Sequence, residues 1–184
     1  SYEGQKVTVG AGVMINFLAL EIIKNGLSGL EWASGIPGTV GGCIFGNAEA
    51  YKVSSFEYLT TVTYIDKDLH LVKKAKDELT YGYRTSYFKE HPENIIIEAT
   101  FTFPKGLKEQ SLEVIRDRLQ RRLSSQPLEY PSAGSVFRNP SSELASGKLI
   151  DELGLKGTKI GGACISEKHA NFIINIGGAT GKDI

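Results

Sequence analysis

One arginine lies in the most aromatic stretch of the chain. Arg84 is surrounded by Tyr81, Tyr83, Tyr87 and Phe88. Such neighbours are expected to desolvate and stack a guanidinium, and a desolvated arginine holds a carboxylate or a developing negative charge well. The same pattern also fits an arginine that anchors a loop through hydrogen bonds to carbonyls. Arg84 is therefore either an anion-binding residue or a structural one.

Ser135 is the second candidate for chemistry. It lies in the segment PSAGSVFRNP, residues 131–140, where glycine and proline hold its hydroxyl on a rigid turn beside Arg138 and Asn139. The G-x-S-x-G elbow of serine hydrolases is absent and no histidine stands in a recognisable triad context, so a serine nucleophile is disfavoured. A proton donor, a hydrogen-bonding residue and an ordinary turn serine remain as interpretations.

A glycine-rich segment is the third candidate. Glycine lets the main chain approach a phosphate closely, so a run of backbone N–H groups here could face an anionic ligand. The segment lacks the GK[ST] ending of a Walker A loop and the G-x-G-x-x-G spacing of a dinucleotide fold. A cofactor loop and a set of structural turns are both open for its residues: Gly35, Ile36, Pro37, Gly38, Thr39, Val40, Gly41 and Gly42.

Composition limits the class of protein. The 184 residues carry 21 basic and 21 acidic side chains and are 41% hydrophobic, which argues against disorder and against a general nucleic-acid binder. No apolar run approaches the length of a membrane span. Cys43 and Cys164 are predicted to be reduced thiols of a cytoplasmic protein. The three histidines have no metal-ligand spacing, so no metal site is expected, and His169 is interpreted as a residue at the entry to a strand.

The elements that must position these residues are mixed helices and strands. Periodic apolar residues predict helices over 17–24, with Asn16 as N-cap and Gly26 beyond the end, 109–122 and 147–153. Strands are predicted over 6–9, 95–103 and 170–176, together with a hairpin over 56–73 that turns at 66–68. Residues 29–46 are expected to be loop because they contain so many glycines. This mixture predicts an α+β fold, with a boundary where Pro127 and Pro131 end the second helix.

Four segments, taken in order, resemble one family over nearly the whole chain. They are GLSGLEWASGIPGTVGG at 26–42, YRTSYFK at 83–89, Gln126-Pro127 followed by PSAGSVFRNP at 131–140, and GKLI, GLKG, IGGA and KHANF between 147 and 172. Together they are similar to the UDP-N-acetylenolpyruvoylglucosamine reductases, the MurB family of peptidoglycan synthesis.

The resemblance implies a fold, an activity and roles. Residues 1–126 would be part of an FAD-binding domain like that of vanillyl-alcohol oxidase, and 127–184 the start of an α+β substrate-binding domain. The family reduces UDP-N-acetylglucosamine enolpyruvate to UDP-N-acetylmuramate with FAD and NADPH. Arg84 would lie by the flavin and the substrate carboxylate, Ser135 would be the general acid, Arg138 and Asn139 would bind substrate, and residues 35–42 would approach FAD. No nucleic acid, membrane or obligate protein partner is implied. A non-catalytic nucleotide-sugar or flavin binding module is the alternative.

Three departures from the family pattern carry expectations. A second FAD phosphate loop, of the Gly-Gly-Gly-Ser-Asn kind, would precede residue 1, and a glutamate that completes catalysis would follow residue 184, so the chain is expected to be a fragment. Glu49 and Lys52 stand where the family shows glycine. Backbone freedom at φ > 0 would be lost at these two positions.

Overall fold

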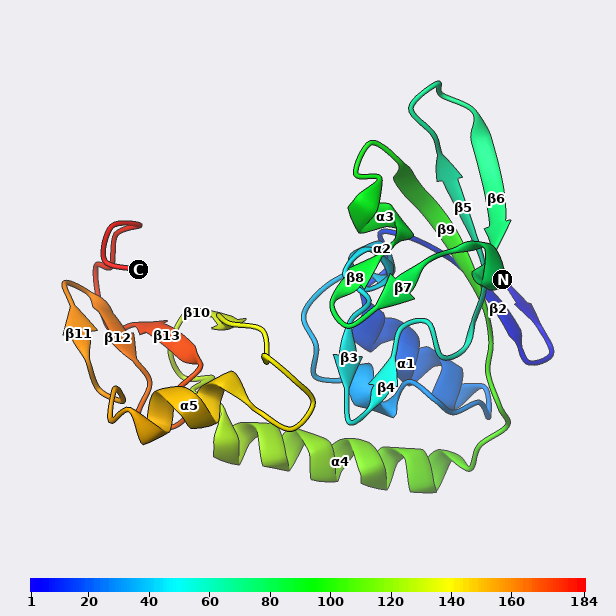
Figure 1. Ribbon diagram of the computed structural model, residues 1–184. Coiled ribbons are helices and arrows are strands. Elements are labelled where there is room, and N and C mark those ends of the chain that lie inside the picture. Colours follow the sequence, from blue (N-terminus) through cyan, green and yellow to red (C-terminus); the bar gives the residue numbers. More distant parts are fainter. The chain divides into compact units, whose positions relative to one another are not determined.

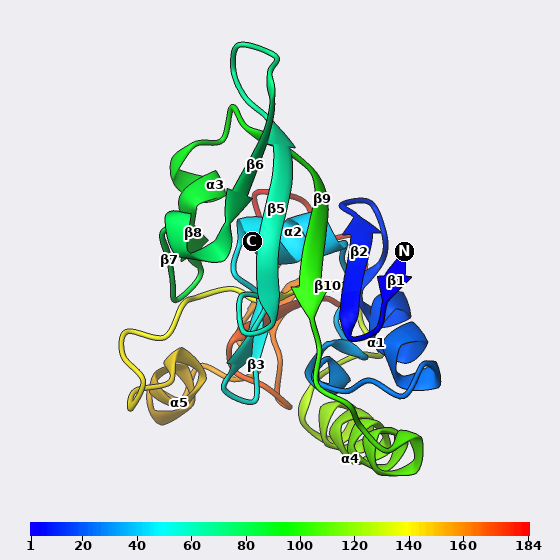
Figure 2. The same ribbon diagram turned by 90° about the vertical axis from the view of Figure 1, so that its right-hand side faces the viewer.

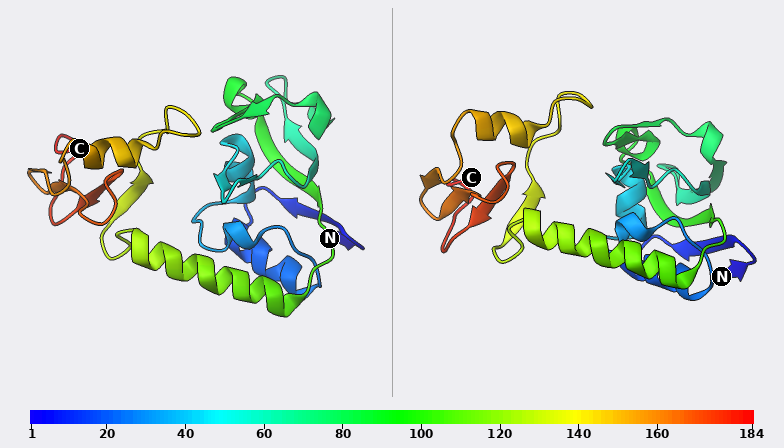
Figure 3. Two further views of the ribbon diagram at one scale, coloured as in Figure 1. Left: turned by 60° about the horizontal axis from the view of Figure 1, so that its bottom comes forward. Right: turned by 90° about the horizontal axis from the view of Figure 1, so that it is seen from below.

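The computed structural model describes all residues from Ser1 to Ile184 and divides them into two compact units, Ser1–Leu119 and Gln120–Ile184. The division falls inside α4 (Lys108–Ser125), the long helix that Figures 1 and 3 show in green. Sequence analysis expected the boundary after this helix, at the prolines. The first turns of α4 belong to the first unit because Ser111 and Ile115 are buried there, whereas Leu123 is exposed.

A five-stranded antiparallel sheet forms the centre of the first unit. Its strand order is β1-β2-β9-β5-β6, and Figure 2 shows α1 and α2 behind it. Phe101 and Val62 are buried between this sheet and the helices, together with α1 residues such as Ile22. The strands are β1 (Tyr2–Glu3), β2 (Lys6–Gly10), β5 (Leu59–Ile65), β6 (Leu71–Ala75) and β9 (Ile95–Thr102).

The predicted hairpin and the long strand are confirmed as β5, β6 and β9. Asp66 makes the turn, since its Oδ1 accepts the N–H groups of Asp68 and His70, each at 2.9 Å. These bonds, His70 first, lower the pKa of the Asp66 carboxyl. Asp66, Asp68 and His70 place their polar atoms within 4.8 Å of one another, a grouping that sequence spacing did not suggest. The bonds inside the turn account for it.

Helix α1 (Ile15–Lys24) follows from its apolar spacing. The buried residues recur at three and four positions along one face: Ile15, Leu18, Ala19, Ile22 and Ile23. It ends in a Schellman motif, with Gly26 at φ +73° and the Leu27 N–H donating to Ile22 O at 2.9 Å. The prediction that Asn16 is the N-cap is wrong. Asn16 lies inside the helix, because the Ile15 N–H donates to the Gly38 carbonyl and the helix starts earlier.

The prediction of loop throughout 29–46 is also wrong. It contains the short 3₁₀ helix η1 (Glu31–Ala33) and the helix α2 (Val40–Phe45). Thr39 caps α2, its Oγ1 accepting the Gly42 N–H at 3.2 Å, and Cys43 and Ile44 are buried. Capping and burial outweigh the cost of about 1 kcal/mol for each helical glycine.

Short elements complete the first unit. They are the hairpin of β3 (Glu49–Ala50) and β4 (Val53–Ser54), the 3₁₀ helix η2 (Lys76–Glu78), the hairpin of β7 (Tyr81–Gly82) and β8 (Thr85–Ser86), and α3 (Tyr87–Glu90). None of the helices combines the length and apolar character needed to cross a bilayer. Both cysteines are free and buried.

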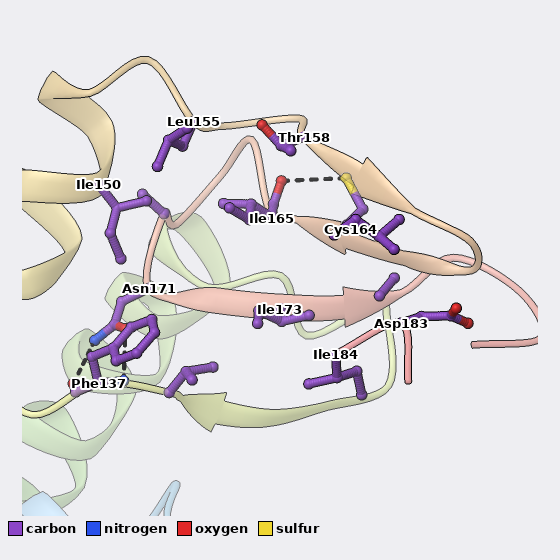
Figure 4. Close-up of a pocket in the computed structure, with 14 residues that line it drawn as sticks. Phe137, Ile150, Leu155, Thr158, Cys164, Ile165, Asn171, Ile173, Asp183 and Ile184 are labelled. Atoms are coloured by element: carbon purple, nitrogen blue, oxygen red, sulfur yellow. Dashed lines mark hydrogen bonds between the residues drawn. The ribbon is translucent and has the colours of Figure 1, made fainter. Parts of the chain in front are cut away.

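The second unit has a four-stranded antiparallel sheet in the order β10-β13-β12-β11. Its elements are β10 (Ser132–Ser135), α5 (Ser146–Glu152), β11 (Lys159–Ile160), β12 (Ala163–Ile165) and β13 (Phe172–Asn175), so the predicted helix and final strand are confirmed with shifted ends. Figure 4 shows a mostly apolar pocket of about 290 Å³, with Ile150 of α5, Leu155 and Ile173 among the residues that line it.

The turn between β3 and β4 carries backbone strain. Tyr51 and Lys52 form a two-residue turn with φ of +55° and +64°, the pattern of a type I′ hairpin, which favours glycine at its second position. A glycine would therefore relieve backbone strain at Lys52. It would relieve none at Glu49, whose φ is not positive.

We expect Lys52→Gly to raise the free energy of unfolding by about 0.5–1 kcal/mol. A side chain in the left-handed region costs about 1–2 kcal/mol. Glycine avoids this cost, but it loses more conformational entropy on folding, which cancels part of the gain. Urea unfolding measures the change. Lys67→Gly, at an exposed turn position with no positive φ, is the matched control and should lower stability. A fall in stability for Lys52→Gly as large as for the control would contradict the strain.

Candidate active site

The glycine segment begins α2 with its amides already used. Val40 N–H donates to Val13 O at 2.8 Å, Gly41 N–H to Ala11 O at 2.9 Å, and Gly42 N–H to Thr39 Oγ1. A run of free N–H groups is therefore not found at these three positions. The segment joins the end of β2 to the starts of both helices. At these three positions it therefore forms structural turns, one of the two interpretations of its glycines.

A hollow of about 420 Å³ nevertheless opens beside α2. Three of the eight predicted cofactor residues, Thr39, Gly41 and Gly42, line it, and residues 35–38 and Val40 do not. The rest of its wall comes from other elements: Ala11, Gly12, Phe45, Asn94 and Ile96. Most of this wall is small or apolar, so a flat apolar ring can approach the main chain closely here. Asn94 is the polar wall residue that sequence reasoning missed, because its own segment carries no motif.

Arg84 lies at the tip of the β7–β8 hairpin. Gly82 pairs with Thr85, which leaves Tyr83 and Arg84 as the turn, and Arg84 has φ +57°. A non-glycine residue in the left-handed region is uncommon, and such strain concentrates at functional sites. The turn places Arg84 at the exposed end of the hairpin.

The prediction that aromatic neighbours desolvate the Arg84 guanidinium is wrong, because Arg84 is exposed. Two of the rings contact other residues: Tyr81 stacks on Phe56 with centroids 4.5 Å apart, and the Lys74 ammonium lies 4.3 Å from the centroid of the Tyr87 ring. An exposed guanidinium remains available to a ligand.

Two hydrogen bonds join this hairpin to the end of α2. Ser86 Oγ donates to Phe45 O at 2.7 Å, and Asn47 Nδ2 donates to Gly82 O at 2.8 Å. Arg84 also acts on the helix electrostatically. Burial raises the pKa of the Cys43 thiol to about 11, and the Arg84 charge lowers it by a smaller amount.

Ser135 ends β10 in the second unit. It is exposed, and Gly134 before it has φ +81°. The chain after it is held by the buried side chain of Asn171, whose Oδ1 accepts the Phe137 N–H at 2.9 Å while its Nδ2 donates to Phe137 O at 2.8 Å. These two bonds fix the main chain two residues after Ser135.

Ser135 lines a polar hollow of about 420 Å³. Asn139 is there too, and its Oδ1 accepts the Ser146 N–H at 3.1 Å at the start of α5. Arg138 is exposed and is not part of the wall. Sequence reasoning missed four charged residues and one histidine of this hollow: Lys148, Asp151, Lys156, Lys168 and His169. Each of these lysines has an acidic partner: Lys156 lies 2.9 Å from Asp151, Lys148 lies 3.7 Å from Glu152, and Lys168 lies 3.7 Å from Glu129. Such partly exposed ion pairs are weak, so the ammonium groups can still turn to an anionic ligand.

His169, expected to be only a strand-entry residue, is both structural and part of the hollow. Its Nδ1 accepts the Asn171 N–H at 3.2 Å. Burial lowers the pKa of His169 below its usual value, and the nearby Lys156 charge acts in the same direction. The imidazole is therefore held neutral.

Two family models match this chain in order. Residues 1–73 match an FAD binding domain, and residues 126–184 match the C-terminal domain of UDP-N-acetylenolpyruvoylglucosamine reductase. Over 183 residues the chain is 45% identical to the UDP-N-acetylenolpyruvoylglucosamine reductase of Fervidobacterium nodosum. This match covers 99% of this chain and 59% of that protein. A Thermotoga relative of the same name is 46% identical over 182 residues, with 99% and 60% covered.

The chain belongs to the UDP-N-acetylenolpyruvoylglucosamine reductase family. The crystal structure of the MurB enzyme from Thermus caldophilus has a TM-score of 0.86 and 35% identity to it, covering all of this chain and 66% of that one. The α+β fold and the family resemblance are thereby confirmed. The chain spans about 59% of the length of the curated relatives it matches.

The Cys43 thiol of this family member is expected to be unreactive. With a pKa of about 11, about one molecule in a thousand carries the thiolate at pH 8, and the thiolate is the reactive form. In a Cys164→Ala background, labelling by a disulfide reagent should be slow for the folded protein and fast in urea. Rapid labelling of the folded chain would contradict this burial.

The lowered pKa of His169 predicts a pH dependence of stability. The unfolded state takes up a proton near pH 6.5, whereas the folded state takes it up only at lower pH. The stability contributed by neutral His169 is therefore complete above pH 6.5 and falls as the pH drops toward the folded pKa. The urea midpoint is measured at pH 7.5 and at pH 5.5. The difference between these two midpoints should be smaller in His169→Asn than in the parent chain. An unchanged difference between the two pH values would refute the assignment.

Proposed function

We propose that the protein reduces UDP-N-acetylglucosamine enolpyruvate to UDP-N-acetylmuramate, using FAD and NADPH, in peptidoglycan precursor synthesis. The observation that carries this is the family match, in order, along nearly the whole chain at 45% identity. Two local features support it: a hollow of small and apolar residues beside α2, and a lysine-rich hollow around Ser135.

The two units divide the work in this proposal. Residues 1–126 form part of the FAD-binding domain, and 127–184 begin the substrate-binding domain. The cytoplasm is the proposed location, because NADPH and UDP-sugars are its metabolites. A net charge of zero supports the absence of a nucleic-acid partner; neither a membrane nor an obligate protein partner is part of the proposal.

The residues beside α2 fit a flavin. Gly12 has no atom within 4 Å of the place where a Cβ would stand, and Gly42 meets only Thr39 Oγ1 at 3.4 Å. Phe45 and Ile96 supply apolar surface, and Asn94 supplies a polar edge. A flavin bound there would supply the hydride chemistry that links NADPH to the enolpyruvyl double bond. Residues 35–42 are proposed to support its binding, with Thr39, Gly41 and Gly42 in contact.

Arg84 is proposed to stabilise the charge that this reduction creates. Hydride addition turns the enolpyruvyl group into an enolate, in which negative charge spreads onto the carboxylate. A guanidinium held by a strained, anchored turn interacts more strongly with that enolate than with the starting carboxylate, which lowers the barrier. The exposure of Arg84 and its left-handed backbone support this role.

Ser135 is proposed to be the general acid. Its Oγ–H gives its proton to the carbon that bears the carboxylate, which completes the saturated lactyl ether. A serine hydroxyl is a weak acid, so it must be oriented well, and the Asn171 bonds next to it serve that need. Arg138 and Asn139 are proposed to bind substrate, with the lysines of the hollow facing the diphosphate.

The experiment that tests the function separates the two half-reactions. In a protein of the relatives' full length, Ser135→Ala should slow flavin reoxidation by the enolpyruvyl substrate by about 10²–10⁴-fold. This is the factor by which general acid catalysis typically raises a rate. Flavin reduction by NADPH should change less than about twofold, since Ser135 takes no part in it. Stopped-flow absorbance of the flavin measures both rates. Ser132→Ala, on the same exposed strand, is the matched control.

The other outcomes discriminate clearly. Equal loss of both half-reactions, or of neither, removes Ser135 from the role of acid. A parent protein that binds the sugar nucleotide without oxidising its flavin supports the binding-module alternative instead.

The same measurement applies to Arg84. Arg84→Ala should also slow reoxidation, by about 10²-fold or more, because it removes one preorganised charge from the transition state. Arg84→Lys keeps the charge but not the planar fork and should recover only part of the rate. Parent-like reoxidation in Arg84→Ala would remove the guanidinium from the mechanism.

A further inference from the structure

Asn47 is a buried polar residue to which the mechanism above gives no task. It follows the end of α2, it is 4% exposed, and its backbone has φ +40°. The Asn47 N–H closes the last turn by donating to Ile44 O at 3.2 Å. Asparagine tolerates a left-handed backbone better than most residues, but that tolerance does not explain what its side chain does.

The carboxamide is aimed at the Arg84 hairpin, residues 81–86. Nδ2 donates to Gly82 O at 2.8 Å. Because the partner is a carbonyl, the atom that faces it must be the nitrogen, so the orientation of the amide is settled. Gly82 lies two residues before Arg84, at the last paired position of β7.

The other half of the carboxamide has no partner. Asn47 Oδ1 is buried and accepts no hydrogen bond within the chain. Buried acceptors without donors are rare, because they lose water without compensation. This unpaired acceptor offsets part of the stabilisation that the Gly82 bond gives, so a role in holding the hairpin accounts for Asn47 better than core stability does.

A second bond completes the attachment on the far side of the turn. Ser86, two residues after Arg84 and fully buried, donates its hydroxyl to Phe45 O at 2.7 Å. The strained Arg84 turn is therefore held at both ends against one short helix, and α2 contacts β8 and α3 directly. A left-handed arginine persists only where its surroundings over-determine it.

We propose that Asn47 is a positioning residue for Arg84, acting through the Gly82 carbonyl. It holds the left-handed turn in place, so that the guanidinium meets the developing charge without reorganising. This inference rests on the role of Arg84 in the proposed function. A small misplacement of a charged group lowers the rate of the step that uses it while leaving other steps intact.

The test uses Asn47→Gly and Asn47→Asp in a protein of the relatives' full length. Glycine removes the carboxamide but accepts the left-handed backbone, and aspartate keeps the shape but, in its ionised form, cannot donate to Gly82 O. The matched control is Ser55→Ala. Ser55 is buried and donates to Cys43 O at 2.8 Å and to Ala48 O at 2.9 Å, so it supports the same end of α2 without contacting the hairpin.

Two readouts are expected to change together. In the FAD-free protein, hydrogen exchange over residues 82–86 should accelerate about tenfold in both Asn47 variants, the effect of losing one buried hydrogen bond, and stay unchanged in Ser55→Ala. In the FAD-loaded protein, both Asn47 variants should slow reoxidation by substrate about tenfold and leave reduction by NADPH within about twofold. Ser55→Ala should leave the ratio of the two rates unchanged.

Each contrary result has one meaning. Unchanged exchange in Asn47→Gly overturns the attachment itself. Faster exchange with parent-like reoxidation overturns the positioning role, and so does an equal loss of both half-reactions. A parent protein whose flavin the enolpyruvyl substrate never reoxidises rejects the proposed function instead, and with it the role of Arg84 that Asn47 would serve, whereas the exchange measurement still decides the attachment.

Discussion

The close approach of Gly41 to Ala11 is the constraint on which the first unit depends. A Cβ on Gly41 would lie 2.9 Å from the Ala11 Cβ, nearer than side chains tolerate, so only glycine allows the Gly41 N–H to reach Ala11 O at 2.9 Å. The neighbouring bonds from Val40 to Val13 and from Ile15 to Gly38 follow from the same contact. They set where α1 and α2 begin. The end of α2 in turn holds Asn47 and the Arg84 hairpin, so the position of the arginine traces back to one missing side chain.

The sequence predicts elements well where burial repeats with a regular period. The stripe on α1 and the alternation in β9 are properties of one segment, so they can be read without knowing the partner surface. Helix α2 is different. Its two glycines disfavour a helix locally, and the burial of Cys43 and Ile44 that stabilises it exists only after the sheet has formed. The start of α1 was misplaced for a related reason, because its first amide is satisfied by Gly38 from a distant part of the chain.

The same distinction explains the sites. The sequence pattern around Arg84 assigns its aromatic neighbours to the guanidinium, whereas Phe56, from the turn before β5, and Lys74 of β6 contact two of those rings. Around Ser135, the lysines and His169 are spread over about twenty residues without a motif. They gather only because α5 lies against the segment before β13, where Gly147 is next to His169 and Asn171. A motif predicts which residue type is present, and tertiary contacts decide what surrounds it.

The chemistry proposed for the two units places opposite demands on their surfaces. A flavin needs walls with little side chain, which the small residues beside α2 provide, while a sugar diphosphate needs cations, which the lysines around Ser135 provide. A serine hydroxyl is a weak acid, so the proposed protonation of carbon depends on how well that hydroxyl is oriented. In the proposed chemistry the guanidinium and the hydroxyl act on different steps, and each must be fixed within its own unit. The hydrogen bonds of Asn47, Ser86 and Asn171 to main-chain groups beside Arg84 and Ser135 meet that requirement: they hold the backbone and leave both functional side chains exposed.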